Sequence, residues 1–168
     1  HLAIQKGHTD IAMKLIECLK ALPNQINVKD KEGYTPLHCA IENGQTDIAM
    51  KLIENLQASP DQLSVLDDFR EMPLYYAIRH VQPEVAMKLI ECLKASPHQL
   101  SVLNEDGYTP LHCAIGCDLP IVAMKLIECL KVSPDQLNVK DKGGDTPLHL
   151  AIEEKQTEVA MKLIECLK

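Results

Sequence analysis

The hexapeptide Ala-Met-Lys-Leu-Ile-Glu at residues 12–17 decides the fold of this chain. It recurs unchanged at 49–54, 86–91, 123–128 and 160–165, so each copy starts 37 residues after the last. A fixed period of this length indicates a repeat array. In such an array each unit is one supersecondary structure that buries its apolar face against its neighbours.

The period divides the 168 residues into a single repeat domain of five units. The complete units are 30–66, 67–103 and 104–140, and the partial ones are 1–29 and 141–168. Because the chain starts at His1 inside one unit and stops inside another, we expect it to be part of a longer protein. The terminal units keep the apolar stripe of the interior ones, which predicts end-to-end self-association when the chain is expressed alone.

Each unit predicts two helices. Thr35 can cap the first helix with Pro36 in its first turn, and the apolar residues that follow recur at i, i+3 and i+4. Gly44 is typical of a helix end, and a second amphipathic helix begins near Thr46. Aromatic residues make up only 3% of the chain, which suits a core of packed helices better than a β-sandwich.

The segment Thr-Pro-Leu-His-x-Ala at 35–40, 109–114 and 146–151, which follows a turn rich in Asp and Gly, resembles the ankyrin repeat. The resemblance covers essentially the whole chain. It implies an all-α solenoid, a stack of helix pairs joined by β-hairpin-like turns, in which the His column forms hydrogen bonds within and between repeats. Tetratricopeptide and other two-helix solenoids lack the Thr-Pro-Leu-His segment.

The units depart from that pattern in two ways. They are four residues longer than the usual ~33, and Ser59-Pro60-Asp61-Gln62 in the added stretch reads as a capping box that starts one extra helical turn. In unit 67–103, Arg70 replaces the Gly of the turn and Val81 replaces the Gly that ends the first helix. We expect strain at Arg70 and a distorted helix end at Val81.

Charge and composition exclude several functions. A net charge of −7 argues against nucleic-acid binding, and no apolar run is long enough for a membrane span. The odd number of cysteines, seven, fits reduced thiols in a cytoplasmic setting, or in a host cytosol if the protein is a secreted effector. His112, Cys113 and Cys117 match no zinc-ligand spacing. We find no catalytic motif and expect no enzyme activity, cofactor or metal.

The columns that vary between the near-identical units mark candidate binding residues. They lie at the turn tips and at the end of the first helix, where the ankyrin resemblance places a concave protein-binding face. Aromatic and Arg side chains are enriched among interface hot spots. The predicted partner-binding residues are Tyr34, Glu42, Asn43, Phe69, Arg70, Arg79, His80 and Tyr108. In the competing interpretation Tyr75 and Tyr76 fill the core and Phe69 folds over its own loop.

The predicted function is a non-catalytic scaffold that binds a protein partner, and the acidic charge favours a partner with a basic patch. Two alternatives stay open. The array could be the targeting arm of a larger enzyme or secreted effector whose catalytic domain lies elsewhere, or it could be a mechanical spacer without a selective partner.

Overall fold

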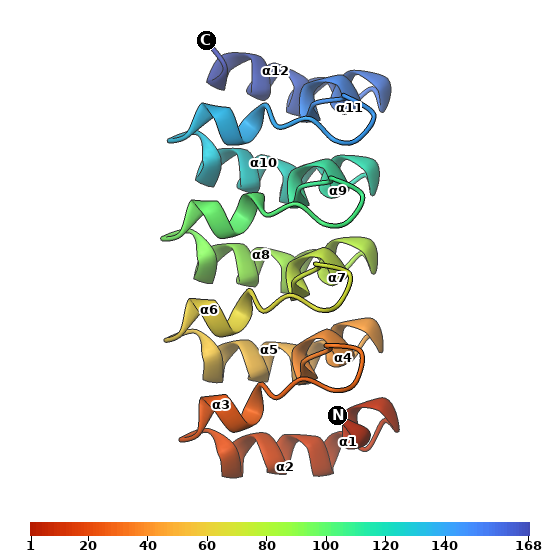
Figure 1. Cartoon of the computed structure of the whole chain (residues 1–168), viewed down its shortest axis with the longest axis vertical. Helices are drawn as coiled ribbons and strands as arrows, with labels where there is room; N and C mark the ends of the chain where they lie inside the picture. The colour runs from red at the N-terminus through yellow and green to blue at the C-terminus, as the bar shows by residue number, and fades with distance from the viewer.

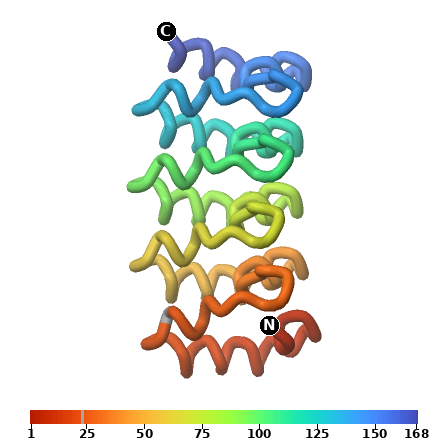
Figure 2. The backbone as a smooth tube through the Cα atoms, viewed as in Figure 1, coloured from red at the N-terminus to blue at the C-terminus, as the bar shows by residue number. Residues whose placement is uncertain are grey.

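The computed structural model is an elongated stack of helix pairs, with the N-terminus at one end and the C-terminus at the other (Figure 1). The structure describes residues 1–22 and 24–168. These residues form helices and turns without a β-strand, which confirms the prediction of an all-α repeat solenoid. The backbone repeats the same path in each layer (Figure 2).

Two columns of helices run along the stack (Figure 1). The first helices are α1 (Leu2–Gln5), α4 (Pro36–Glu42), α7 (Pro73–Arg79), α9 (Pro110–Gly116) and α11 (Pro147–Glu153). The second helices are α2 (Thr9–Leu19), α5 (Thr46–Leu56), α8 (Pro83–Leu93), α10 (Pro120–Leu130) and α12 (Thr157–Cys166). None of the described helices is long and apolar enough to cross a bilayer.

The first helices begin as the sequence predicts. The Oγ1 of Thr35 accepts the backbone N–H of His38 at 3.5 Å, and the Nδ1 of His38 accepts the N–H of Thr35 at 3.1 Å. His38 therefore takes the place of the Glu or Gln of an ordinary capping box. Pro36 lies in the first turn, where a backbone N–H has no partner within the helix, so its missing N–H removes no hydrogen bond. The same box starts α9 and α11, whereas α7 begins at Met72 without a side-chain cap.

The core is continuous from one repeat to the next. Leu37 and Ile41 of α4 and Ile48, Leu52 and Ile53 of α5 are buried almost completely. The residues in the same columns of the third and fourth units are buried as well. The two ends of the stack, which lack one neighbour, show how much surface stacking covers. Leu15 is 51% exposed in the first unit whereas Leu52, in the same column, is 1% exposed. Ile164 is 38% exposed in the last unit whereas Ile53 is 0% exposed. Each repeat thus depends on its neighbours to cover its apolar face.

The four added residues form the predicted extra helical turn. These turns are α3 (Pro23–Ile26), α6 (Pro60–Leu63), η1 (Pro97–Ser101) and η2 (Pro134–Leu137). The predicted capping box is wrong, because the side chains of Ser59, Ser96 and Ser133 make no cap hydrogen bond. The polar groups instead join successive turns. For example, Gln99 Nε2 donates to Asp61 Oδ1 at 2.7 Å.

Arg70 and Val81 of unit 67–103 have left-handed backbone angles. The Arg70 position is glycine in the other turns, whereas the Val81 position is glycine in the first two units and Asp118 and Lys155, also at positive φ, in the last two. Arg70 has φ 60° where Gly33 has φ 79°, and Val81 has φ 52° where Gly44 has φ 67°. The expected distortion at Val81 is absent: its N–H donates to the Ile78 carbonyl at 3.0 Å, as Gly44 donates to Ile41 at 3.0 Å. The backbone path is the same with and without glycine, so the strain falls on the substituted residue.

We therefore predict that Val81→Gly raises the free energy of unfolding by about 1 kcal/mol, because a β-branched residue is strained at positive φ. The side chain is exposed, so its removal costs little burial. Gly44→Val, at the matched position of the preceding unit, should lower stability by a similar amount. Urea unfolding followed by circular dichroism measures both, and a loss of stability in Val81→Gly would contradict the prediction.

Candidate functional site

A buried side chain in each of α4, α7 and α9 bonds to the next repeat. The Nδ1 of His38 accepts the Thr35 N–H, so its Nε2 carries the proton and donates to the Glu71 carbonyl at 3.1 Å. His112 reaches the carbonyl of Asp145 in the same way at 3.3 Å. Both partners lie 33 residues further along the chain. These contacts agree with the structural role that the ankyrin resemblance implied for this column.

Tyr75 replaces His in this column and keeps the bond. Its hydroxyl lies 2.7 Å from the Tyr108 carbonyl, again 33 residues further on, and it also contacts the Val102 carbonyl. Burial raises the pKa of the Tyr75 phenol, so the hydroxyl keeps the proton that it donates. The exchange of His for Tyr therefore preserves the tie between repeats three and four.

Next to this column, the turn tips and first helices enclose a cavity of about 330 Å³. Five of the predicted binding residues line it: Tyr34, Glu42, Phe69, Arg79 and His80. Five lining residues were not in the predicted set: Glu71, Tyr76, Asn104, Glu105 and Asp106. The cavity spans three successive repeats and is centred on α7. We call these ten residues the α7 pocket.

The floor of the α7 pocket is an ion pair held from three sides. Arg79 donates from Nη1 to Glu71 Oε1 at 2.6 Å, and its Nη2 lies 2.5 Å from Oε2, so the fork is bidentate. Glu71 is 4% exposed and also accepts from Asn104 Nδ2 at 3.0 Å. The guanidinium carbon lies 4.9 Å from the centre of the Tyr76 ring. The charge of Arg79 is therefore largely satisfied within the protein.

One wall of the pocket is a set of fixed rings. The Tyr76 hydroxyl donates to Asp67 Oδ2 at 2.6 Å, and its ring packs edge-on against Tyr34 at 5.7 Å between centroids. The His80 ring stacks on Tyr76 at 6.3 Å. Burial, followed by the Asp67 hydrogen bond, raises the pKa of Tyr76, so it stays a neutral donor. These contacts hold the wall in one arrangement.

Most of the chain matches a known repeat family. The family described as ankyrin repeats (3 copies) matches residues 1–64 and 74–168. The chain belongs to the ankyrin-repeat family. No curated protein matches it significantly. Ankyrin repeats are generally protein–protein interaction modules, and the fold is typically non-catalytic. The residues between the two matched ranges include Phe69 and Arg70, the tip of the turn beside the α7 pocket.

The other predicted binding residues lie outside the α7 pocket. Arg70 lines a second hollow between the turns, together with Leu103 and Lys142. Asn43 donates from its side chain to the Cys39 carbonyl at 2.8 Å. Tyr108 is partly exposed, and its ring lies beside His112. The ankyrin stack thus brings five of the eight residues to one cavity and leaves three outside its lining.

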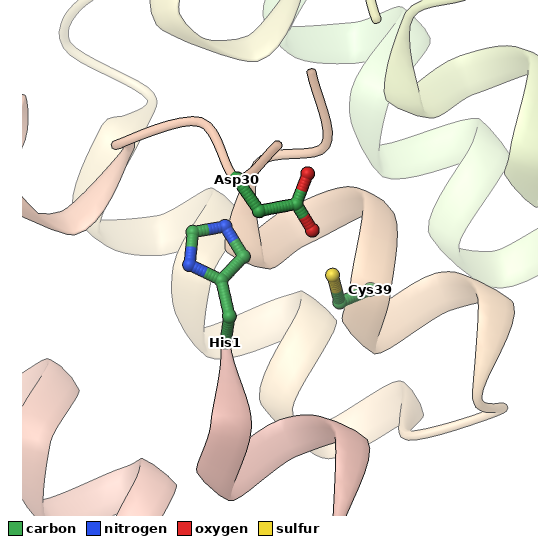
Figure 3. Close-up of side chains that lie close together, drawn as sticks. All are labelled: His1, Asp30 and Cys39. Atoms are coloured by element: carbon green, nitrogen blue, oxygen red, sulfur yellow. The ribbon is translucent and has the colours of Figure 1, made fainter. Parts of the chain in front are cut away.

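Three potential metal ligands also lie together: His1, Asp30 and Cys39, whose ligand atoms lie within 4.8 Å of one another (Figure 3). Each has a structural role. His1 Nε2 bonds to the Tyr34 carbonyl at 2.8 Å, and Asp30 Oδ1 accepts the Tyr34 amide at 2.9 Å. Burial raises the pKa of the Cys39 thiol to about 11, so the thiolate that would bind a metal is disfavoured.

The same three columns meet in the next ankyrin repeat, where no metal set is formed. There the residues are His38, Asp67 and Tyr76, and the Tyr76 hydroxyl bonds to Asp67. The repeat register is therefore enough to explain why His1, Asp30 and Cys39 lie together.

The residues that sequence reasoning missed carried one usable signal. In unit 67–103 an acid, Glu71, stands where two other units have Tyr34 and Tyr108, and a base, Arg79, stands where the other units have Glu, Gln or Gly. An acid and a base introduced in the same unit, eight residues apart across a turn, are candidates for pairing. Tyr76 is a core residue, as the competing interpretation predicts, and its ring also forms a wall of the pocket.

The buried histidines predict acid sensitivity. Burial lowers the pKa of His38 from 6.5 to about 4, and the pKa of His112 is lowered for the same reason. Between pH 6.5 and about 4 His38 binds a proton in the unfolded chain more readily than in the folded one. The contribution of its neutral, buried form to stability is therefore complete above about pH 6.5 and is lost as the pH falls towards 4. We expect a slope approaching ~1.4 kcal/mol per pH unit from His38, and His112 should add to it in the same direction.

Urea unfolding at pH 7 and pH 5 measures this slope. His38→Gln should reduce it, and His98→Gln, at an exposed position, should leave it unchanged. An unaltered slope in His38→Gln would show that other groups cause the acid sensitivity.

Proposed function

We propose that this ankyrin-repeat protein is a non-catalytic scaffold that binds a protein partner at the α7 pocket and the turn tips around it. The observation that carries the proposal is the gathering of Tyr34, Phe69, Arg79 and His80 at one cavity on the near-copied array. Phe69 is 52% exposed, unlike the packed tyrosines beside it. An exposed ring next to a rigid charged floor is typical of an interface anchor.

The mechanism is rigid presentation. The ion pair of Arg79 and Glu71 and the ring wall of Tyr76 are already ordered before a partner arrives, so little conformational entropy is lost on binding. The net charge of −7 favours a partner with a basic patch. The seven cysteines without a disulfide framework support a cytosolic setting for this binding.

Affinity capture with the immobilised chain tests the binding face. Wild type and Val132→Ala should retain the same specific proteins, because Val132 is exposed and lies outside the pocket. Phe69→Ala should lose them, with a loss in affinity of about 2 kcal/mol, as expected for an aromatic hot spot. Capture that is equally strong with Phe69→Ala, in a folded variant, would contradict the proposal.

We also propose that the chain, when expressed alone, associates end to end. Leu2, Ile11 and Leu15 are exposed at one end of the stack, and Ile152, Met161 and Ile164 are exposed at the other. In interior repeats the residues in the same columns form the two sides of one buried interface. A second copy stacked head to tail would rebuild that interface and cover both faces.

Sedimentation over a concentration range tests this association. Wild type should form head-to-tail oligomers that grow with concentration, and Leu15→Glu should shift the distribution to monomer because it places a charge in the rebuilt interface. Ile121→Glu is the matched control, since Ile121 is an exposed apolar residue away from both ends. A monomeric wild type at high concentration, or equal oligomers in Leu15→Glu, would contradict end-to-end association.

A further inference from the structure

The α7 pocket carries negative charge that the protein itself does not neutralise. Glu71 is paired with Arg79, but Glu42, Glu105 and Asp106 form no ion pair within the described residues. Glu42 ends α4 in the repeat before α7, and the other two acids lie in the turn of the repeat after it. The carboxylates therefore face the pocket from its two sides along the stack.

An aromatic face is also available in the pocket. Tyr76 already accepts the Arg79 guanidinium on its ring, at 4.9 Å from the ring centre. Phe69 stands at the tip of the same repeat with half its surface exposed, and among the described residues it has no ring or cation partner. The pocket thus has one occupied and one open position for a cation against a ring.

We propose that the α7 pocket holds an arginine side chain supplied by a basic segment of the protein partner. The guanidinium would lie on Phe69 and bond to the carboxylates of Glu105 and Asp106, with Glu42 on the far side. The inference rests on the proposed binding function and names the chemistry of the partner.

The observations favour arginine over the other occupants. A planar guanidinium can stack on a ring and donate to carboxylates in the same plane, whereas an ammonium group is a compact, strongly hydrated point charge. A volume of about 330 Å³ lies at the lower limit for ligand sites, which suits a single side chain. An anionic group is disfavoured, because the donors of Arg79 are directed at Glu71 and the rim is acidic.

NMR titration of the isotope-labelled 168-residue chain tests the inference with three peptides: acetyl-Gly-Arg-Arg-Gly-amide, its Lys-Lys counterpart and its Glu-Glu counterpart. The arginine peptide should shift the amide signals of Phe69, Glu105 and Asp106 most, and it should bind at least threefold more tightly than the lysine peptide. The glutamate peptide should leave these signals unchanged.

Variants separate a built site from general attraction to an acidic surface. Glu105→Gln with Asp106→Asn should weaken the arginine peptide at least tenfold, and Phe69→Leu, which keeps apolar bulk without a ring, several-fold. Glu153→Gln with Glu154→Gln removes the same charge from an exposed position outside the pocket and should have little effect. An equal loss in this control, or equal binding of the arginine and lysine peptides, would overturn the inference.

This outcome is distinguishable from failure of the proposed function. If Phe69→Ala abolishes protein capture while the peptides show no preference for arginine, the proposed binding face is supported and the proposed arginine site is contradicted. If the arginine peptide binds the α7 pocket but protein capture does not depend on Phe69, the arginine site is supported and the proposed scaffold function is contradicted.

Discussion

The hydrogen bond from a buried first-helix side chain to a backbone carbonyl 33 residues further on is the constraint on which the rest of the structure depends. It is made by His38, by His112 and, with a phenol in place of an imidazole, by Tyr75. A buried carbonyl without a donor is costly, so each turn is held at one height above the helix below it. A second set of hydrogen bonds between repeats lies at the start of the second helices, and it too fixes the alignment of one repeat on the next. For example, Gln82 Nε2 donates to the Ile41 carbonyl at 2.6 Å.

This constraint explains why one repeat can change so much without altering the stack. In unit 67–103 the imidazole, the capping Thr and two glycines are all replaced, yet the backbone follows its neighbours. Tyr75 restores the tie, and Arg70 and Val81 keep the left-handed backbone of the matched positions in the other units. The side chains that depart from the common pattern, above all Glu71 and Arg79, then form the floor of the α7 pocket, and no other unit has an acid and a base at these two positions.

Much of the fold follows from local spacing. The capping Thr35 with Pro36 and the extra turn at 60–63 were predictable, because each depends on residues within a few positions of one another. The 37-residue period could be read because the same hexapeptide recurs along the chain. The Ser59 capping box was wrong for a related reason. A polar side chain has more than one possible partner, and in the stack the polar residues of the added turns reach the neighbouring repeats.

The sequence by itself determined the repeat unit, its two helices, the ankyrin family and the unit in which unusual side chains collect. Only the tertiary structure decided which of them meet: that Phe69 and Arg79 share a cavity with Asp106, and that Arg70 lies outside it. The physical reason is that contacts within a unit are set by helix and turn geometry over short distances. The alignment of one unit on the next is set by helix packing and by hydrogen bonds between residues more than thirty positions apart, which no local pattern encodes.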